Sequence, residues 1–387
     1  MASLENKMKK IVLITGALLG LGLSAWAQDL EKDVRTLASE DYGGRETGTE
    51  GETKAARHIV MQLRKAGLEP VLQAFEGHGT SGHNVVAVIH GSTDEGLIIG
   101  AHYDHLGGDG KKVYCGADDN ASGTAVVLEM GRRFAKKPSK RTIILVAFSG
   151  EEMGVLGSRY YVNHPAVLET PVAMINLDMV GRLRENLIVF GADTGDRFKE
   201  YLADSPIKIA YNRDAIGPSD HTSFVLKGIP SVHLFTGAHA DYHKPGDTAD
   251  KLNYEGLGRV ADLVENLARK IGDAPERMTY VKPPPAAQLP RAGKGGTPYF
   301  GVMPDYGYDG KGVKLQGVAP GSPAEKSGLK EGDVLLSLNG KDVDDVKEYS
   351  AIFFGLKPGD EVTLGYLREG KKSTVKATLL SKNRSDE

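Results

Sequence analysis

The chain has 387 residues, of which 40% are hydrophobic and 26% charged, a composition typical of a globular protein long enough for more than one domain. Its formal net charge of -3 includes no basic surplus, which argues against nucleic acid or anionic lipid as a partner. The single cysteine, Cys115, excludes an intramolecular disulfide and is expected to be a small buried thiol.

The N-terminal segment has the pattern of a signal peptide. Two lysines precede an apolar run over residues 11–23, and an A-x-A cleavage site ends at Ala27. The run is shorter than the roughly 18 apolar residues that a membrane span needs. We therefore expect residues 1–27 to be removed on export, giving a periplasmic or secreted protein with no stable membrane insertion. Met8 is a plausible start, so residues 1–7 need not be native.

From about residue 30 to 274, apolar runs alternate with helical patterns, which indicates βα units around one sheet. Helices are predicted over residues 53–67, where Gly67 is a natural stop, and over 122–137 and 257–271. Short, continuously apolar runs predict strands that are covered on both faces. These runs are 84–89, 96–101, 142–148, 171–178, 186–191 and 230–235. The expected fold class is α/β, with a mixed, mostly parallel sheet sandwiched by helices.

The composition changes after residue 274. Residues 275–297 are rich in Pro and Gly and are predicted to be a semi-rigid linker. Residues 298–381 show glycine-punctuated turns and alternating apolar residues, typical of a small, mainly β domain, and 382–387 form a polar tail. All eleven histidines lie between His58 and His243, so any imidazole chemistry belongs to the first domain, residues 28–274.

Acidic and imidazole side chains gather where the predicted strands end. They are His102, Asp104, Glu151, Glu152, Asp178 and, after a longer loop, His243. In open α/β sheets, ligands bind outside the carboxyl ends of the strands. Carboxylates mixed with imidazoles suit zinc, manganese or cobalt better than calcium or magnesium.

The stretch GADDNASG places Asp118 and Asp119 side by side before a helix. Capping of the helix N-terminus would need only one of them. Two metal ions about 3.5 to 4 Å apart need a shared carboxylate, which one of these aspartates can supply. The residues alone therefore support hydrolysis at a two-metal site, without specifying the substrate.

Six motifs make the sequence recognisable: GAHYDH, GADDNASG, FSGEEMGVLGS, NLDMVGR, SDHTSF and YHKPGDT, in this order. Over about residues 30–272, the chain resembles the M28 family of zinc aminopeptidases, which have the zinc exopeptidase fold. The resemblance implies two Zn²⁺ ions, with Mn²⁺ or Co²⁺ as possible substitutes. His102, Asp118 and Asp178 would bind one ion, and Asp118, Glu152 and His243 the other, with Asp118 as the bridge.

The same resemblance implies roles for the remaining motif residues. Glu151 would be the general base that takes a proton from the metal-bound water and returns it to the leaving amine. Asp104 would orient the His102 imidazole by a hydrogen bond. The peptide bond between Asp118 and Asp119 would be cis, with Asp119 outside the ligand set. The expected substrates are peptides with a free N-terminus.

Residues 298–381 resemble a PDZ domain of the type found in exported bacterial proteases, most specifically in SPAEKSGLKEGDVLLSLNGKDV. Tyr299, Phe300, Gly301 and Val302 match the loop that binds a carboxylate in that family. The resemblance implies that a peptide C-terminus is held there while its chain adds to the edge of the sheet. A purely structural or assembly role for the domain remains open.

Three other functions compete with an exported aminopeptidase. A carboxypeptidase or a glutaminyl cyclase-like enzyme could share the fold, although the cyclase relatives use one zinc. A PDZ-led peptide-binding protein could carry a vestigial hydrolase, which the presence of Glu151 beside a full ligand set argues against. The sequence does not specify the preferred N-terminal residue, the metal loaded in the cell or the oligomeric state.

Overall fold

The computed structural model describes residues 25–382, apart from 78, 109, 168–170, 213–214, 283–296, 305–307, 309, 320 and 354. Residues 1–24 of the predicted signal peptide lie outside this description, as do most of the predicted linker and residues 383–387 of the tail. No helix among the described residues is long and apolar enough to cross a membrane.

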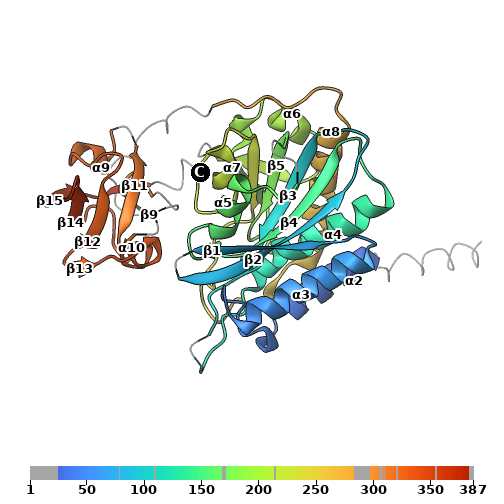
Figure 1. The fold of residues 1–387 in the computed structure, drawn as a ribbon, viewed down its shortest axis with the longest axis horizontal. Coiled ribbons are helices and arrows are strands. Elements are labelled where there is room, and N and C mark those ends of the chain that lie inside the picture. The colour runs from blue at the N-terminus through green and yellow to red at the C-terminus, as the bar shows by residue number, and fades with distance from the viewer. Residues whose placement is uncertain are drawn as a thin grey trace, which may run out of the picture.

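The first domain is built on an eight-stranded mixed sheet (Figure 1) with the order β1-β2-β4-β3-β5-β8-β6-β7. Its strands are β1 (Val71–Gly77), β2 (Thr80–Ile89), β3 (Gly96–His102), β4 (Thr142–Phe148), β5 (Ala173–Leu177), β6 (Asn186–Phe190), β7 (Lys208–Tyr211) and β8 (Ser231–Phe235). The central strands β4, β3, β5 and β8 run parallel, as do β6 and β7. The pairings of β1 with β2, β2 with β4, and β6 with β8 are antiparallel. The predicted mixed, mostly parallel sheet is confirmed.

Helices cover both faces of this sheet. One face contacts α3 (Glu50–Lys65), α4 (Gly123–Lys136) and α8 (Tyr254–Asp273), and α2 (Ala25–Leu37) packs on α4 and α8. The other face contacts α5 (Leu156–Asn163) and α7 (His221–Val225). The short α6 (Phe198–Leu202) contacts α8, and 3-10 turns occur at Glu40–Tyr42, Ala192–Thr194 and Ala249–Lys251.

The side chains of the central strands alternate between two hydrophobic cores. In β3, Leu97 and Ile99 point into the larger core, under α4 and α8, whereas Ile98 points into the smaller one. In β4, Leu145 joins the larger core and Val146 the smaller. Because successive strand residues face opposite sides of a sheet, burial on both faces explains the continuously apolar runs in the sequence.

Helix α2 overlaps the last three residues of the predicted signal peptide, since it begins at Ala25. Its apolar residues Leu30, Val34 and Leu37 are fully buried in the larger core. The chain directly after the predicted cleavage site therefore belongs to the folded domain.

The C-terminal domain has its own core, which includes Phe300, Leu315, Leu335 and Leu364. Its main sheet has the order β10-β11-β12-β14-β15, with β13 paired to β12, and a small sheet pairs β9 with β16. The elements are β9 (Thr297–Tyr299), β10 (Val302–Pro304), β11 (Val313–Val318), α9 (Pro323–Lys326), β12 (Val334–Leu338), β13 (Lys341–Asp342), α10 (Val346–Phe353), β14 (Glu361–Arg368), β15 (Lys371–Thr378) and β16 (Leu380–Lys382).

Candidate metal centre

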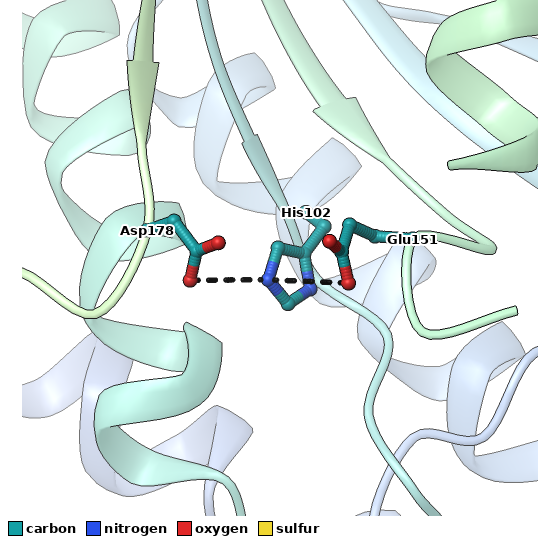
Figure 2. Close-up of side chains that lie close together, drawn as sticks. All are labelled: His102, Glu151 and Asp178. Atoms are coloured by element: carbon teal, nitrogen blue, oxygen red, sulfur yellow. Dashed lines mark ion pairs between the residues drawn. The ribbon is translucent and has the colours of Figure 1, made fainter. Parts of the chain in front are cut away.

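The parallel strands deliver the predicted residues to one edge of the sheet. Strand β3 ends in His102, β4 leads into Glu151 and Glu152, and β5 leads into Asp178. Figure 2 shows the carboxylates of Asp178 and Glu151 on either side of the His102 imidazole. A common edge follows from the parallel order of β4, β3 and β5, because parallel strands end on the same side.

A first group of donor atoms surrounds His102. Its Nε2 atom lies 3.4 Å from Asp119 Oδ1, 3.4 Å from Asp178 Oδ1 and 4.0 Å from Glu151 Oε2. His102 is 1% exposed, and its Nε2 has no hydrogen-bond partner among the described residues. A buried ring nitrogen that faces carboxylate oxygens is arranged as a metal ligand would be.

A second group surrounds the other oxygen of Asp119. The His243 Nε2 atom lies 3.1 Å from Asp119 Oδ2 and 3.2 Å from Glu152 Oε2. His105 approaches Glu152 from the other side, with its Nδ1 atom 2.7 Å from Oε1. The two oxygens of the Asp119 carboxylate therefore face two separate groups of donors.

The prediction that Asp118 bridges two metal ions is not supported by this geometry. The Asp118 side chain is fully buried but turned away: Oδ1 accepts a hydrogen bond from the Gly181 amide at 2.7 Å, and Oδ2 lies 3.2 Å from His239 Nε2. The predicted cis bond between residues 118 and 119 is also wrong, since the cis peptide joins Asp119 to Asn120. Neighbouring side chains in this turn point in different directions, and the one that faces His102 and His243 is Asp119.

Asp104 acts differently from the expectation. Its carboxylate lies 3.8 Å from His102 Nδ1, whereas its main-chain oxygen lies 3.2 Å from the same atom. The carboxylate instead accepts hydrogen bonds from the amides of Glu151 and Glu152 and from the Thr47 hydroxyl. Asp104 thus holds the backbone of the two adjacent glutamates, and its carbonyl orients the imidazole.

The two glutamates have opposite electrostatic environments. Burial raises the pKa of Glu151 well above its usual range. His102 lowers this pKa, whereas the carboxylates of Glu152 and Asp178 raise it further. Burial would also raise the pKa of Glu152, but hydrogen bonds from His105 and His243 hold it well below its usual range. Of this adjacent pair, Glu151 is therefore the one that favours holding a proton.

The donor chemistry of the two groups fits two divalent cations. Asp119, Glu151, Glu152 and Asp178 are gathered in one largely buried space, where their negative charges repel one another. Burial would lower the pKa of His243, but Asp119 and Glu152 raise it to about 10. Imidazoles facing several carboxylates form the mixed nitrogen and oxygen donor set that zinc prefers.

Sequence reasoning gave no role to several residues that shape this centre. His105, three residues after His102 in the GAHYDH motif, lies beside Glu152 in the structure. Asp247 lies within the YHKPGDT motif, and neither it nor Arg45 carried a signal of its own in the sequence. Cys115 is a free, buried thiol, as predicted.

Sequence relatives of this chain include several named aminopeptidases and related enzymes. It is 31% identical to leupeptin-inactivating enzyme 1 of Streptomyces exfoliatus over 56% of this chain and 50% of that protein. It is 34% identical to aminopeptidase YwaD of Bacillus subtilis over 43% of this chain and 39% of that protein. The uncharacterised protein YfbL of Escherichia coli is 30% identical over 62% of this chain and 87% of that protein. The chain thus spans half or less of the first two relatives.

Solved structures show the same fold as the first domain. An aminopeptidase from Aneurinibacillus sp. strain AM-1 matches with a TM-score of 0.58 and 19% identity, over 66% of this chain and 96% of that chain. BSAP, a zinc aminopeptidase from Bacillus subtilis, matches with a TM-score of 0.57 and 19% identity, over 66% and 98% of the two chains.

Two family profiles match different parts of the sequence. The PDZ domain profile matches residues 295–379, the region of the C-terminal domain. The profile of peptidase family M28 matches residues 84–268, which include every residue of both donor groups. The relative from Escherichia coli aligns with this chain over 280 residues, which cover 87% of its own length. The chain therefore belongs to peptidase family M28 and carries a C-terminal PDZ domain.

Proposed function

We propose that this protein is an exported two-zinc aminopeptidase that removes N-terminal residues from peptides. The observation that carries the proposal is the Asp119 carboxylate, whose Oδ1 faces His102 at 3.4 Å and whose Oδ2 faces His243 at 3.1 Å. A carboxylate that presents one oxygen to each of two donor groups is what a two-metal hydrolase requires.

The proposed ligands follow the two groups. His102, Asp119 and Asp178 would hold one zinc ion, and Asp119, Glu152 and His243 would hold the other. His105 is proposed to fix the orientation of Glu152 rather than to bind zinc, because it contacts Oε1 while His243 faces Oε2. Bound zinc ions would polarise the scissile carbonyl and lower the pKa of the attacking water.

Glu151 is the proposed general base and acid. It would accept a proton from the attacking water and deliver that proton to the leaving amine. Burial and the neighbouring carboxylates raise its pKa above the usual range, which suits a group that must hold a proton during the reaction. The hydrogen bond from the Glu151 amide to Asp104 Oδ1, at 3.2 Å, would keep the base in place while Glu152 faces His243.

A substrate panel on the zinc-loaded full chain tests this function. We expect binding of two zinc ions, hydrolysis of amino-acyl p-nitroanilides, and loss of that hydrolysis in chelator. Cleavage confined to C-terminal residues of peptides would favour a carboxypeptidase instead. Cyclisation of N-terminal glutamine would favour a cyclase, and binding of peptides without turnover would favour a PDZ-led binding protein.

We propose that the PDZ domain binds a peptide C-terminus at the loop that includes Tyr299, Phe300, Gly301 and Val302. This loop leads from the end of β9 into β10, which is the edge strand of its sheet and can accept an added strand. Gly301 has a φ of +87°, and a Cβ atom there would lie 2.2 Å from Ser322 Cβ, so the loop conformation requires glycine. Titration with peptides bearing free or amidated C-termini tests the proposal, since only the free carboxylate should bind.

Export is proposed from the N-terminal pattern alone. Cleavage after Ala27 would leave the buried residues of α2, which start at Leu30, in the mature chain. N-terminal sequencing of protein recovered from the periplasm or medium of an expressing bacterium tests this. A mature chain that begins at Gln28 is the expected result, and an uncleaved cytoplasmic product would contradict it.

A further inference from the structure

The loop that carries His243 also carries Asp247, whose side chain is fully buried. One of its carboxylate oxygens, Oδ2, accepts the amide hydrogens of both Asp118, at 2.8 Å, and Asp119, at 3.0 Å. The main-chain oxygen of Asp247 accepts a third, from the Ala117 amide, at 3.1 Å. Three successive amides of the turn that presents Asp119 are therefore bonded to this one residue.

The other oxygen of Asp247 is bound to Arg182. Arg182 donates from Nη2 to Asp247 Oδ1 at 2.7 Å and from Nη1 to Asp241 Oδ2 at 2.9 Å. Arg182 follows Asp178 by four residues, on the loop after β5. The same loop also bonds the turn directly, because the Gly181 amide donates a hydrogen bond to Asp118 Oδ1. The turn is thus tied to the loops that carry two of the other proposed ligands, Asp178 and His243.

Asp247 brings a third negative charge next to those of Asp118 and Asp119. The side chains of Asp118, Asp119 and Asp247 are all buried. A third buried carboxylate next to the Asp118–Asp119 pair is therefore electrostatically unfavourable. The ion pair between Asp247 and Arg182 offsets this repulsion. A charged acceptor makes stronger hydrogen bonds to amides than a neutral one, which suits a group that must hold a backbone in place.

We propose that Asp247 is a positioning residue for the metal centre. Through its bonds to the amides of Asp118 and Asp119, it sets the direction of the bridging carboxylate and keeps it in register with His243, four residues earlier. The inference rests on the proposed two-zinc function. Loss of an outer partner of a metal ligand typically weakens metal binding about 10 to 100-fold, and we expect that range here.

Asp247→Asn tests this in the full-length protein, with Asp241→Asn as the matched control. An asparagine at position 247 keeps the size of the side chain but has one acceptor oxygen, so it cannot serve both Arg182 and the turn. Asp241 binds the same guanidinium but has no bond to the turn in the structure. Zinc affinity is measured on metal-free protein by competition with a chromophoric chelator, and the ligand geometry by the visible absorption of the Co²⁺ form.

We expect Asp247→Asn to weaken zinc binding about 10 to 100-fold and to shift the Co²⁺ bands, with an unchanged far-ultraviolet circular dichroism spectrum. Asp241→Asn should stay within about twofold of the wild type. A folded Asp247→Asn protein whose affinity and cobalt spectrum match those of the control would overturn the inference. If instead the wild type binds fewer than two zinc ions, the proposed function itself fails, so the two failures are distinguishable.

Should Asp247→Asn not fold, Arg182→Gln serves as the second variant. It keeps the acceptor for both amides but removes the cation that fixes Oδ1 and neutralises the carboxylate. A reduced zinc affinity with a shifted cobalt spectrum supports the inference, and wild-type values for both overturn it.

Discussion

At the scale of single residues, Glu151 and Glu152 are chemically identical but differ in what surrounds them. Glu152 is bonded to His105 and faces His243, whereas Glu151 is buried beside like charges. We expect Glu151→Gln to lower kcat by about 10² to 10⁴-fold while two zinc ions still bind. Glu152→Gln should instead reduce the zinc stoichiometry towards one. Elemental analysis and p-nitroanilide kinetics on the same samples measure both effects.

If Glu151→Gln lost zinc as readily as Glu152→Gln, both side chains would be ligands. The division of tasks between base and ligand would then be wrong.

Arg45 is a buried cation whose hydrogen bonds go to main-chain oxygens. Its guanidinium donates to the carbonyls of Tyr103, Leu37, Cys115 and Gly116, so it joins the end of α2 to the segments before Asp104 and Asp119. Arg45→Met should lower the free energy of unfolding by at least about 2 kcal/mol, because several buried carbonyls lose their donor. Urea denaturation measures this.

Arg57→Met is the matched control for Arg45, because Arg57 is exposed on α3. Its free energy of unfolding should stay within about 0.5 kcal/mol of the wild type. Equal losses in the two variants would mean that the buried hydrogen bonds contribute nothing particular to stability.

At the scale of elements, α2 shows how much of the segment after the proposed cleavage site the fold needs. Leu30 is fully buried in the larger core, and truncating a buried leucine costs about 2 to 5 kcal/mol. In a chain that starts at residue 28, Leu30→Ala should therefore lower the free energy of unfolding by this amount. Gln28→Ala, at an exposed position, should change it little. A Leu30→Ala protein as stable as its parent would show that α2 is dispensable.

The strands that carry the site could be predicted because burial on both faces makes them continuously apolar. The predicted range 142–148 is β4 itself, whereas β1 was missed because most of its residues are exposed or only partly buried. The choice between Asp118 and Asp119 could not be made from the sequence. Both have the same side chain and adjacent positions, and only the bonds to Gly181 and Asp247 decide which one faces the metal groups.

At the scale of the whole molecule, the charges of the metal centre couple zinc binding to protons. Although burial opposes it, Asp119 and Glu152 raise the pKa of His243 to about 10 in the metal-free protein, above its ordinary value of 6.5. A ligand imidazole must be neutral, so zinc uptake at pH 7.5 should release protons and zinc affinity should rise with pH. Calorimetry in buffers of different ionisation enthalpy measures the release.

The raised pKa of His243 also makes the stability of the metal-free protein depend on pH. Because the folded pKa of His243 lies above the unfolded value, its contribution to stability is full below about pH 6.5 and is lost as the pH rises towards about 10. His243→Asn should flatten this part of the stability profile. Zinc uptake by the wild type without proton release would show that the imidazole is already neutral.

The two domains have separate cores, since the cluster of the PDZ domain shares no residue with the clusters around the large sheet. Every proposed ligand and the base also precede residue 244. Deleting residues 297–387 should therefore leave kcat/KM for an amino-acyl p-nitroanilide within about twofold of the full chain, because no core side chain of the first domain is removed.

Longer peptides separate recruitment by the PDZ domain from a purely structural role. If the domain binds peptide C-termini, the deletion should raise KM for peptides with a free C-terminus, while their C-terminally amidated forms are unaffected. A collapse of turnover on the small substrate would instead show that the first domain depends on the PDZ domain for its structure. Because the small substrate has no peptide C-terminus to recruit, comparing the two substrate classes in one deletion variant assigns the role directly.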